Sequence, residues 1–271
     1  MQRRPGKFIT SWVDVTKFML TLVGLAWLVG RGSEQLGYNW HWRKIPGYFF
    51  TLAHGHLHAG PLVDGLVVTL EITACSLVLA ALIGLVTALL RLSSSLVGRF
   101  LAMFYLETIR NTPLLVQIFF LYFVMAPILD LGRFTAAVLA LAFFEGAYAS
   151  EIFRAGIVSI DRGQWEAAYS LGLSRFASYR HIILPQAVRS VLPPLTSQAI
   201  SLLKDSALVS TIAVYDLTMQ GRAIVAETFL VFEVWFTLAA IYLLLACLLS
   251  LLVRLVERRF GSPGQPAWKM P

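Results

Sequence analysis

Long blocks of apolar residues, separated by short polar segments, run along most of the chain. Because a helix needs about 20 mostly apolar residues to cross a bilayer, the blocks predict about six membrane-spanning helices. The expected spans are residues 15–30, 65–90, 100–129, 134–153, 187–204 and 234–256. The third span is interrupted at Asn111-Thr112-Pro113. A further stretch, 206–225, carries Asp216 and Arg222 and is expected to be re-entrant or partly buried.

The composition agrees with this pattern. Of the 271 residues, 58% are hydrophobic and 14% are charged, and the mean hydropathy is +0.72. Soluble domains carry about 25% charged residues, so a soluble enzyme, a disordered chain and a disulfide-stapled secreted module are excluded. The long blocks favour an all-α polytopic membrane protein over a membrane β-barrel. Cys75 and Cys247 lie inside apolar blocks, so we expect no structural disulfide.

The net charge of +7 comes from Lys and Arg residues that flank the apolar blocks. Most of them fall on one side if both termini are cytoplasmic, which is the bias of inner-membrane proteins. The loop 161–185 is then cytoplasmic. The sequence contains no basic run with interleaved aromatic residues, which would indicate a nucleic-acid partner. The expected partner is the lipid bilayer. The basic start and the first apolar block lack a convincing cleavage site, which predicts an uncleaved first helix. Aromatic residues in the outer loop 31–64 are typical of an interfacial belt.

The loop 161–185 has the signals of two short helices joined by a turn. Asp161 can cap the first helix, with Gln164 in a capping-box position. Gly172 suits a left-handed C-cap, Ser174 can start the second helix, and Pro185 begins the fifth span. One apolar face at helical spacing comprises Trp165, Ala168, Tyr169 and Gly172.

These residues resemble the EAA loop of ABC importer permeases. The spaced pattern is Glu166-Ala167-Ala168, three residues, Gly172, nine residues, Ile182, one residue and Leu184-Pro185. Residues 105–117, 147–157 and 203–205 are similar to further signatures of the polar amino-acid branch, the histidine/glutamine/glutamate-type permeases. The resemblance extends from about residue 65 to 259. It implies an ATPase-coupling loop made of Gly163, Gln164, Glu166, Ala167, Ala168, Gly172, Ile182, Leu184 and Pro185.

The resemblance also implies an architecture and partners. The expected fold is that of a type I ABC importer permease with a cytoplasmic coupling helix, and the expected function is import of polar L-amino acids across a bacterial inner membrane. Expected segments are an extra helix and periplasmic loop (1–64), the permease domain (65–260) and a flexible cytoplasmic tail (261–271). Expected partners are two ATPase subunits, a second permease copy or a paralogue, and a periplasmic amino-acid-binding protein. The sequence has no phosphate-binding loop, so ATP and Mg²⁺ are assigned to the ATPase, and no cofactor or metal to this chain.

Polar residues within the spans need a reason, because a charge at a helix centre costs about 2.5–3.5 kcal/mol on insertion scales. The break at Asn111-Thr112-Pro113 should lie within the hydrocarbon core, where irregular backbone is tolerated only against protein or a water-filled cavity. Glu145 is halfway along its span, and no basic residue is near it in the sequence. The expected substrate path comprises Asn111, Thr112, Gln117, Glu145, Tyr148 and Glu71. For each, the alternative is packing between helices.

Other polar residues have more modest interpretations. Glu107 and Arg110 are three apart on one helix and are expected to pair and set its end. The expected gate or hinge, suggested by the resemblance, comprises Pro113, Lys204 and Asp205. His54, His56 and His58 alternate in the outer loop, where a polar interfacial loop is favoured over a zinc site.

Two other functions compete with amino-acid import as interpretations of the sequence. An intramembrane enzyme would need a catalytic pair or zinc motif at depth, and the sequence contains neither of the expected motifs. A structural or electron-transfer subunit would need His pairs within the spans to hold haem, and all five histidines lie outside the predicted spans. A non-transport structural subunit of a membrane complex is therefore kept as the alternative.

Overall fold

The computed structural model describes residues 15–24, 27, 30–32, 38–53 and 56–260. The chain divides into two units, residues 1–43 and 44–271. In the first unit Val15–Gly24 forms a short apolar helix, and the rings of Trp40 and Trp42 stack with centroids 5.8 Å apart. The division falls after Arg43. The predicted tail 261–271 lies outside the described residues.

The second unit begins with short elements around a hairpin. The division falls within the 3₁₀ turn η1 (Trp42–Lys44), after which α2 (Pro46–Phe49) precedes the strands β1 (Phe50–Ala53) and β2 (His56–Ala59). The strands pair antiparallel, with Phe50 opposite Ala59. Of the three alternating histidines, His54 lies outside the described residues, and the His58 side chain is exposed.

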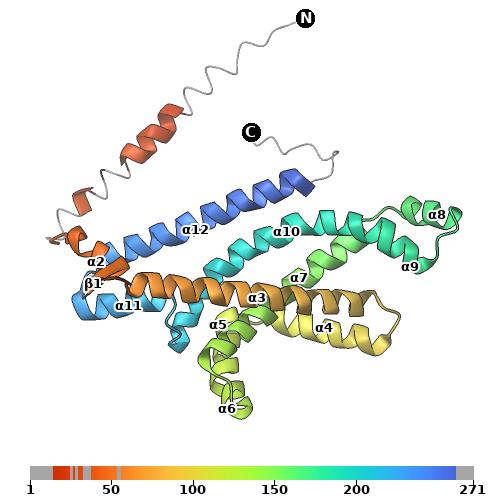
Figure 1. Ribbon diagram of the computed structural model, residues 1–271, viewed down its shortest axis with the longest axis horizontal. Coiled ribbons are helices and arrows are strands. Elements are labelled where there is room, and N and C mark those ends of the chain that lie inside the picture. The colour runs from red at the N-terminus through yellow and green to blue at the C-terminus, as the bar shows by residue number, and fades with distance from the viewer. Residues whose placement is uncertain (1–14, 25–26, 28–29, 33–37, 54–55, 261–271) are drawn as a thin grey trace, which may run out of the picture. The chain divides into compact units, whose positions relative to one another are not determined.

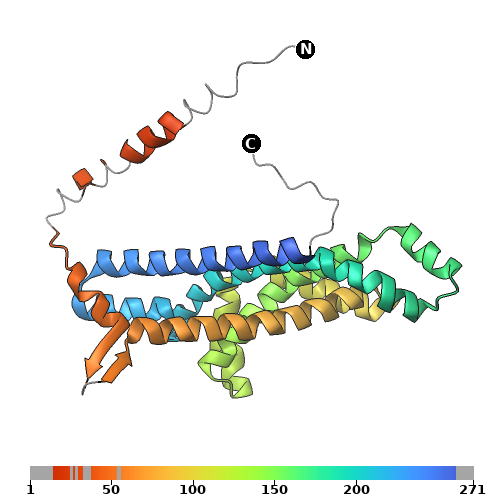
Figure 2. The same cartoon turned by 45° about the horizontal axis from the view of Figure 1, so that its top comes forward.

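Helices make up the rest of the unit (Figures 1 and 2). They are α3 (Pro61–Leu92), α4 (Leu96–Arg110), α5 (Leu114–Phe119), the π-helix η2 (Phe120–Met125), α6 (Ala126–Leu129), α7 (Arg133–Val158), α8 (Arg162–Ser170), α9 (Arg175–Ser178), the π-helix η3 (Tyr179–Ile183), α10 (Leu184–Asp205), the 3₁₀ helix η4 (Ser206–Ile212), α11 (Leu217–Thr228) and α12 (Val231–Phe260).

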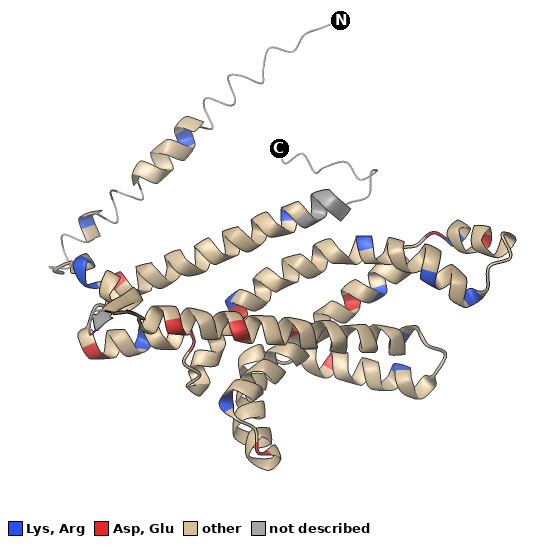
Figure 3. Cartoon of the chain, in the orientation of Figure 1, with Lys and Arg blue, Asp and Glu red and all other residues tan. Residues whose placement is uncertain are grey.

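The long helices α3 and α12 begin near β1 and β2, whereas α7 and α10 are connected at the opposite end through α8 and α9 (Figure 1). We call the end with β1 and β2 the hairpin end, and the end with α8 and α9 the loop end (Figure 1). Charged residues are sparse along the long helices and more frequent around the loop end (Figure 3). This distribution suits helices whose central parts face lipid.

Among the described residues, three helices are long and apolar enough to cross a membrane: α3, α7 and the Val231–Leu255 part of α12. A fourth span is possible if α4 and the segment Leu114–Leu129, bent by 107° from it, count as one. The predicted interruption at Pro113 is therefore a sharp elbow, and α5 and α6 leave the bundle sideways (Figure 1). The predicted fifth span forms α10, but it is not among these three helices, because polar residues such as Arg189 and Gln198, together with Pro193 and Pro194, lower its hydropathy.

Glycines allow α3 and α7 to approach closely. A Cβ added at Gly84 of α3 would lie 2.7 Å from the Ala149 Cβ and 2.9 Å from the backbone oxygen of Gly146. A Cβ at Gly146 would meet the Ile83 side chain at 3.0 Å. Small residues at such positions allow van der Waals packing between membrane helices, where the hydrophobic effect gives little help. Gly156 makes a similar approach to Val191 of α10.

Buried side chains form two hydrophobic clusters. One joins α3, α5, α7, α10 and η4 and includes Ile72, Ile118, Leu141, Leu202 and Val209. The other lies toward the hairpin end and includes Ile45, Leu62, Leu217, Leu230 and Val234. Because Ile45 belongs to the second cluster, the segment before the hairpin packs into the same core as α3 and α11. Cys75 and Cys247 are both free and exposed.

We predict that Gly84→Ala destabilises the helix pair by about 1–3 kcal/mol, the usual cost of overpacking. The added methyl group would press on backbone atoms of α7, which cannot rotate away. Thermal unfolding of the purified protein in detergent would measure the loss. Gly132→Ala is the matched control, because nothing lies within 4 Å of the added Cβ. Equal unfolding temperatures for the two variants would contradict the prediction.

Candidate functional site

The segment at the loop end folds as its local signals predict. Asp161 caps α8, and its Oδ1 accepts a hydrogen bond from the Gly163 backbone N–H at 2.6 Å. Gly172 has a φ of +74°, the left-handed conformation that favours glycine. Ser174 caps α9 by accepting from the Ala177 N–H. Pro185 lies in the first turn of α10.

Gln164 does not act as the capping-box residue that its position suggested. Its Oε1 accepts a hydrogen bond at 3.2 Å from Nε2 of Gln186, on the first turn of α10, and Gln186 also donates to the Ile182 carbonyl. The Trp165 ring packs at 6.3 Å from the ring of Tyr179, in η3. The first short helix is thus attached directly to the segment that leads into α10.

Burial divides the loop residues into two groups. The side chains of Ala168 and Ile183 are fully buried. Glu166 and Gly172 are exposed, and the apolar side chains of Leu171 and Phe176 are 78% and 75% exposed. Exposed apolar side chains on a polar loop indicate a surface that meets another molecule.

A cavity of about 520 Å³ lies between α7 and α10. It is elongated along the two helices, because its lining residues follow helical spacing on both. They are Phe144, Glu145, Tyr148, Glu151 and Ile152 of α7, and Pro194, Ser197, Gln198, Ser201 and Asp205 of α10. The structure therefore places the predicted path residues Glu145 and Tyr148 beside the predicted hinge residue Asp205.

Glu145 is the most deeply placed of these groups, with 3% of its surface exposed. The Gln198 Nε2 donates to its Oε2 at 2.6 Å and to its backbone oxygen at 2.7 Å. The Oε1 of Gln198 is buried without a hydrogen-bond partner. Asp205 lines the same cavity. Several acceptors thus meet in this part of the cavity, which suits a ligand that brings N–H donors.

A second cavity, of about 550 Å³, lies at the elbow and is lined mainly by apolar side chains of α4, α5, η2 and α7. Thr112 and Gln117 line it. Gln117 Nε2 donates to the carbonyls of Ile109 and Thr112, at 2.8 and 3.0 Å. Both amide hydrogens therefore satisfy backbone groups that the break in the helix leaves free. These hydrogen bonds give a structural basis for the alternative role of Gln117, which is packing between helices.

The remaining predicted residues lie elsewhere. Asn111 lines neither cavity; its Nδ2 donates to the backbone oxygen and to Oε2 of Glu107. Glu71 is exposed on α3, and Lys204 is exposed at the end of α10. Pro113 is the N-cap of α5, at the elbow. The predicted pairing of Glu107 with Arg110 is wrong, because Arg110 binds Glu151 instead.

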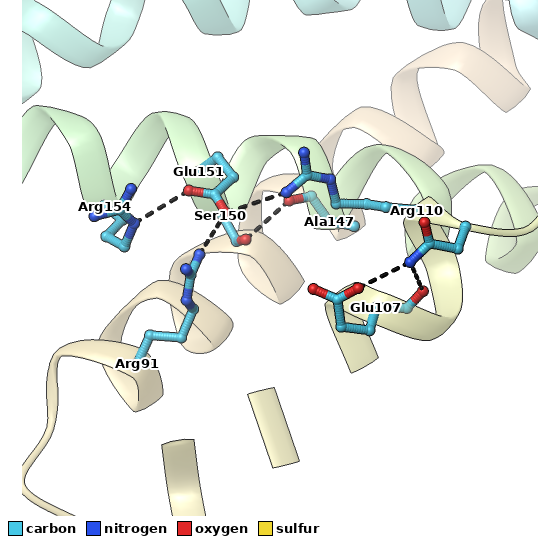
Figure 4. Close-up of polar contacts among 8 residues, drawn as sticks. Arg91, Glu107, Arg110, Ala147, Ser150, Glu151 and Arg154 are labelled. Carbon is cyan, nitrogen blue, oxygen red and sulfur yellow. Dashed lines mark hydrogen bonds and ion pairs between the residues drawn. The ribbon is translucent and has the colours of Figure 1, made fainter. Parts of the chain in front are cut away.

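Three arginines from three helices converge on Glu151 (Figure 4). Arg91 of α3 approaches Oε1 at 2.6 Å, Arg110 of α4 approaches the same oxygen at 3.3 Å, and Arg154 of α7 approaches Oε2 at 3.1 Å. Glu151 also lines the α7–α10 cavity. The cluster therefore fixes the end of α4 to α3 and α7 beside that cavity.

Sequence reasoning missed Gln198, Glu151 and Arg91. The i, i+3 spacing of Glu151 and Arg154 was a usable signal for an ion pair. No local pattern indicates that Gln198 contacts a residue 53 positions away. Within the described residues there is no group of three or more His, Cys, Asp or Glu side chains able to hold a metal ion.

Residues 80–262 match the family described as binding-protein-dependent transport system inner membrane component. The chain belongs to this family. It is therefore a multi-pass protein of the inner membrane and a permease subunit of an import system. The family match covers α4 to α12, including both cavities and the loop.

Characterised relatives of this transport component are named as permeases. The glutamine transport system permease protein of Escherichia coli strain K12 is 39% identical over 201 residues, covering 73% of this chain and 92% of that protein. The L-cystine transport system permease protein of Bacillus subtilis strain 168 is 38% identical over 200 residues, covering 73% of this chain and 86% of that protein.

Solved structures show the same fold. A crystal structure of an amino acid ABC transporter with histidines matches with a TM-score of 0.69 and 41% identity, covering 73% of this chain and 94% of that chain. A methionine ABC transporter in an inward-facing conformation matches with a TM-score of 0.63 at 20% identity, covering 74% of this chain and 96% of that chain. The second match is evidence for the fold alone.

Proposed function

We propose that this transport component is the permease subunit of an ATP-driven importer of polar L-amino acids. The observation that carries the proposal is the loop 161–185: a capped helix with exposed apolar neighbours, hydrogen-bonded and stacked onto the start of α10. Motion of α8 can reach the cavity through α10, because one side of α10 lines that cavity. The relatives named for glutamine and cystine support the amino-acid class.

The loop is proposed to dock on a separate cytoplasmic ATPase. This chain contains no phosphate-binding loop of the Gly-x-x-x-x-Gly-Lys-Ser/Thr type, so ATP and Mg²⁺ belong to that partner. The working assembly would contain two ATPase subunits, two permeases (identical or paralogous) and an extracytoplasmic amino-acid-binding protein. The loop end then faces the cytoplasm and the hairpin end faces outward, with both termini inside. The excess of Lys and Arg toward the loop end supports this orientation (Figure 3).

The orientation predicts which positions an impermeant thiol reagent reaches. In a Cys75→Ser, Cys247→Ser background, Ser170→Cys on α8 should react only after the membrane is permeabilised. Thr51→Cys on β1 should react in intact cells and serves as the matched outer control. Both side chains are exposed. Labelling of the α8 cysteine in intact cells would overturn the proposed coupling, because a cytoplasmic ATPase could not reach the loop.

Coupling should depend on the backbone conformation at Gly172. Gly172→Val forces a β-branched residue into the left-handed region, at a strain of about 1–3 kcal/mol. The turn between α8 and α9 should shift, and substrate-stimulated ATP hydrolysis by the reconstituted complex should fall while membrane insertion is retained.

Gly172→Asn is the matched variant, since asparagine tolerates the same conformation. It should retain most of the stimulation. Full stimulation in Gly172→Val would refute the mechanical role of the turn.

The α7–α10 cavity is the proposed substrate site, with Glu145 facing the ammonium or another N–H-bearing group of the amino acid. Glu145→Gln should lower uptake about tenfold through a raised KM, because a charge-assisted hydrogen bond is lost. Uptake of labelled amino acids into vesicles that carry the complete complex would measure it. Glu227→Gln, at an exposed position on α11, is the control. Unchanged rate and selectivity in Glu145→Gln would remove Glu145 from the path.

A further inference from the structure

Arg110 is a cation at the end of α4, directly before the elbow. It is the last residue of α4, a helix of 15 residues, so its backbone lies about 22 Å from the loop end of that helix. The hydrocarbon core is about 30 Å thick, so an α4 that begins at the edge of that core ends inside it. A charge at this depth is costly and is by default a functional group.

Of the three arginines around Glu151, Arg110 is held least firmly. Its Nη1 lies 3.3 Å from Glu151 Oε1, against 2.6 Å for Arg91 and 3.1 Å for Arg154. Its side chain is 45% exposed, against 17% and 37% for the other two. If Arg110 moved away, Glu151 would keep two guanidinium partners. The carboxylate would remain compensated, so the release of Arg110 leaves no buried charge unpaired.

Arg110 also lies beside the cavity. Its guanidinium carbon is 5.8 Å from the ring centroid of Tyr148, and both Tyr148 and Glu151 line the α7–α10 cavity. Glu145 precedes Tyr148 by three residues on α7, a rise of about 4.5 Å. One part of the cavity therefore presents acceptors, at Glu145 and Asp205, and the neighbouring part has a guanidinium at its edge. Opposite charges one helical turn apart match the ammonium and carboxylate of a free α-amino acid.

We propose that Arg110 exchanges Glu151 for the α-carboxylate of the transported amino acid and so selects for free α-amino acids. This inference rests on the proposed function. The planar guanidinium can bind a carboxylate through two parallel N–H bonds. Glu151 acts as the resting partner that keeps the guanidinium in place when the cavity is empty. Glu107, one turn away, is engaged by Asn111 and leaves the guanidinium free to move.

The test compares each amino acid with its own decarboxylation product. L-histidine is paired with histamine, L-arginine with agmatine, and L-glutamine with 4-aminobutanamide. Equilibrium binding is measured on the permease–ATPase complex in nanodiscs without the binding protein, so that only the membrane site discriminates. Uptake of the three amino acids into vesicles carrying the complete complex is measured alongside.

The wild type should prefer the amino acid over its amine by about tenfold or more, the usual value of a hydrogen-bonded charge pair. Arg110→Gln should abolish that preference, because it should weaken binding of the amino acid and leave binding of the amine unchanged. Arg110→Lys should restore part of it, because lysine keeps the charge without the fork. Arg99→Gln, near the other end of the same helix, should behave as wild type.

The outcomes separate the two proposals. Uptake by the wild type with the same preference in Arg110→Gln would overturn the role of Arg110 and leave the proposed function standing. Equal weakening of amino acid and amine in Arg110→Gln would assign Arg110 a purely structural role and overturn the inference as well. A wild-type complex that takes up none of the three amino acids would overturn the proposed function together with the inference.

Discussion

The close contact between α3 and α7 is the constraint on which the polar features of this protein depend. Gly84 and Gly146 bring the two helices together, and this contact fixes the rotation of α7 about its own axis. The side of α7 with Gly146 and Ala149 faces α3. The side with Glu145, Tyr148 and Glu151 is consequently turned toward α10 and the end of α4. A bulkier residue at the contact would rotate the carboxylates as well as separate the helices.

The elbow between α4 and α5 illustrates how a membrane protein keeps irregular backbone at depth. A break exposes carbonyl groups that lipid cannot satisfy. Here Asn111 donates to the Glu107 carbonyl, and Gln117 donates to those of Ile109 and Thr112. The amide side chains take the place of the missing helical hydrogen bonds. The bend is therefore built into the sequence as a set of local replacements.

Features set by neighbours in the sequence could be predicted, whereas features set by tertiary packing could not. Asp161, Gly172 and Ser174 act within a few residues, so their capping roles were visible in the sequence. Glu145 was found because a charge in an apolar block stands out, but its partner Gln198 comes from another helix. Arg110 was assigned to Glu107 because that carboxylate is nearest in sequence. In the folded chain Arg110 pairs with Glu151 instead. The side chain of Asn111 donates a hydrogen bond to Glu107.

The π-helix η3 sets which side of α10 meets the cavity. A π turn holds one residue more than an α turn, and each residue in an α-helix advances the chain by about 100°. Shortening Tyr179–Ile183 by one residue would restore regular winding and turn α10 relative to α8 by that angle. Ser197, Gln198 and Ser201 would then point away from Glu145. The extra residue in this turn thus sets the rotation of α10 about its own axis. With this rotation the first turn of α10 contacts the loop, and the polar side of its later turns faces the cavity.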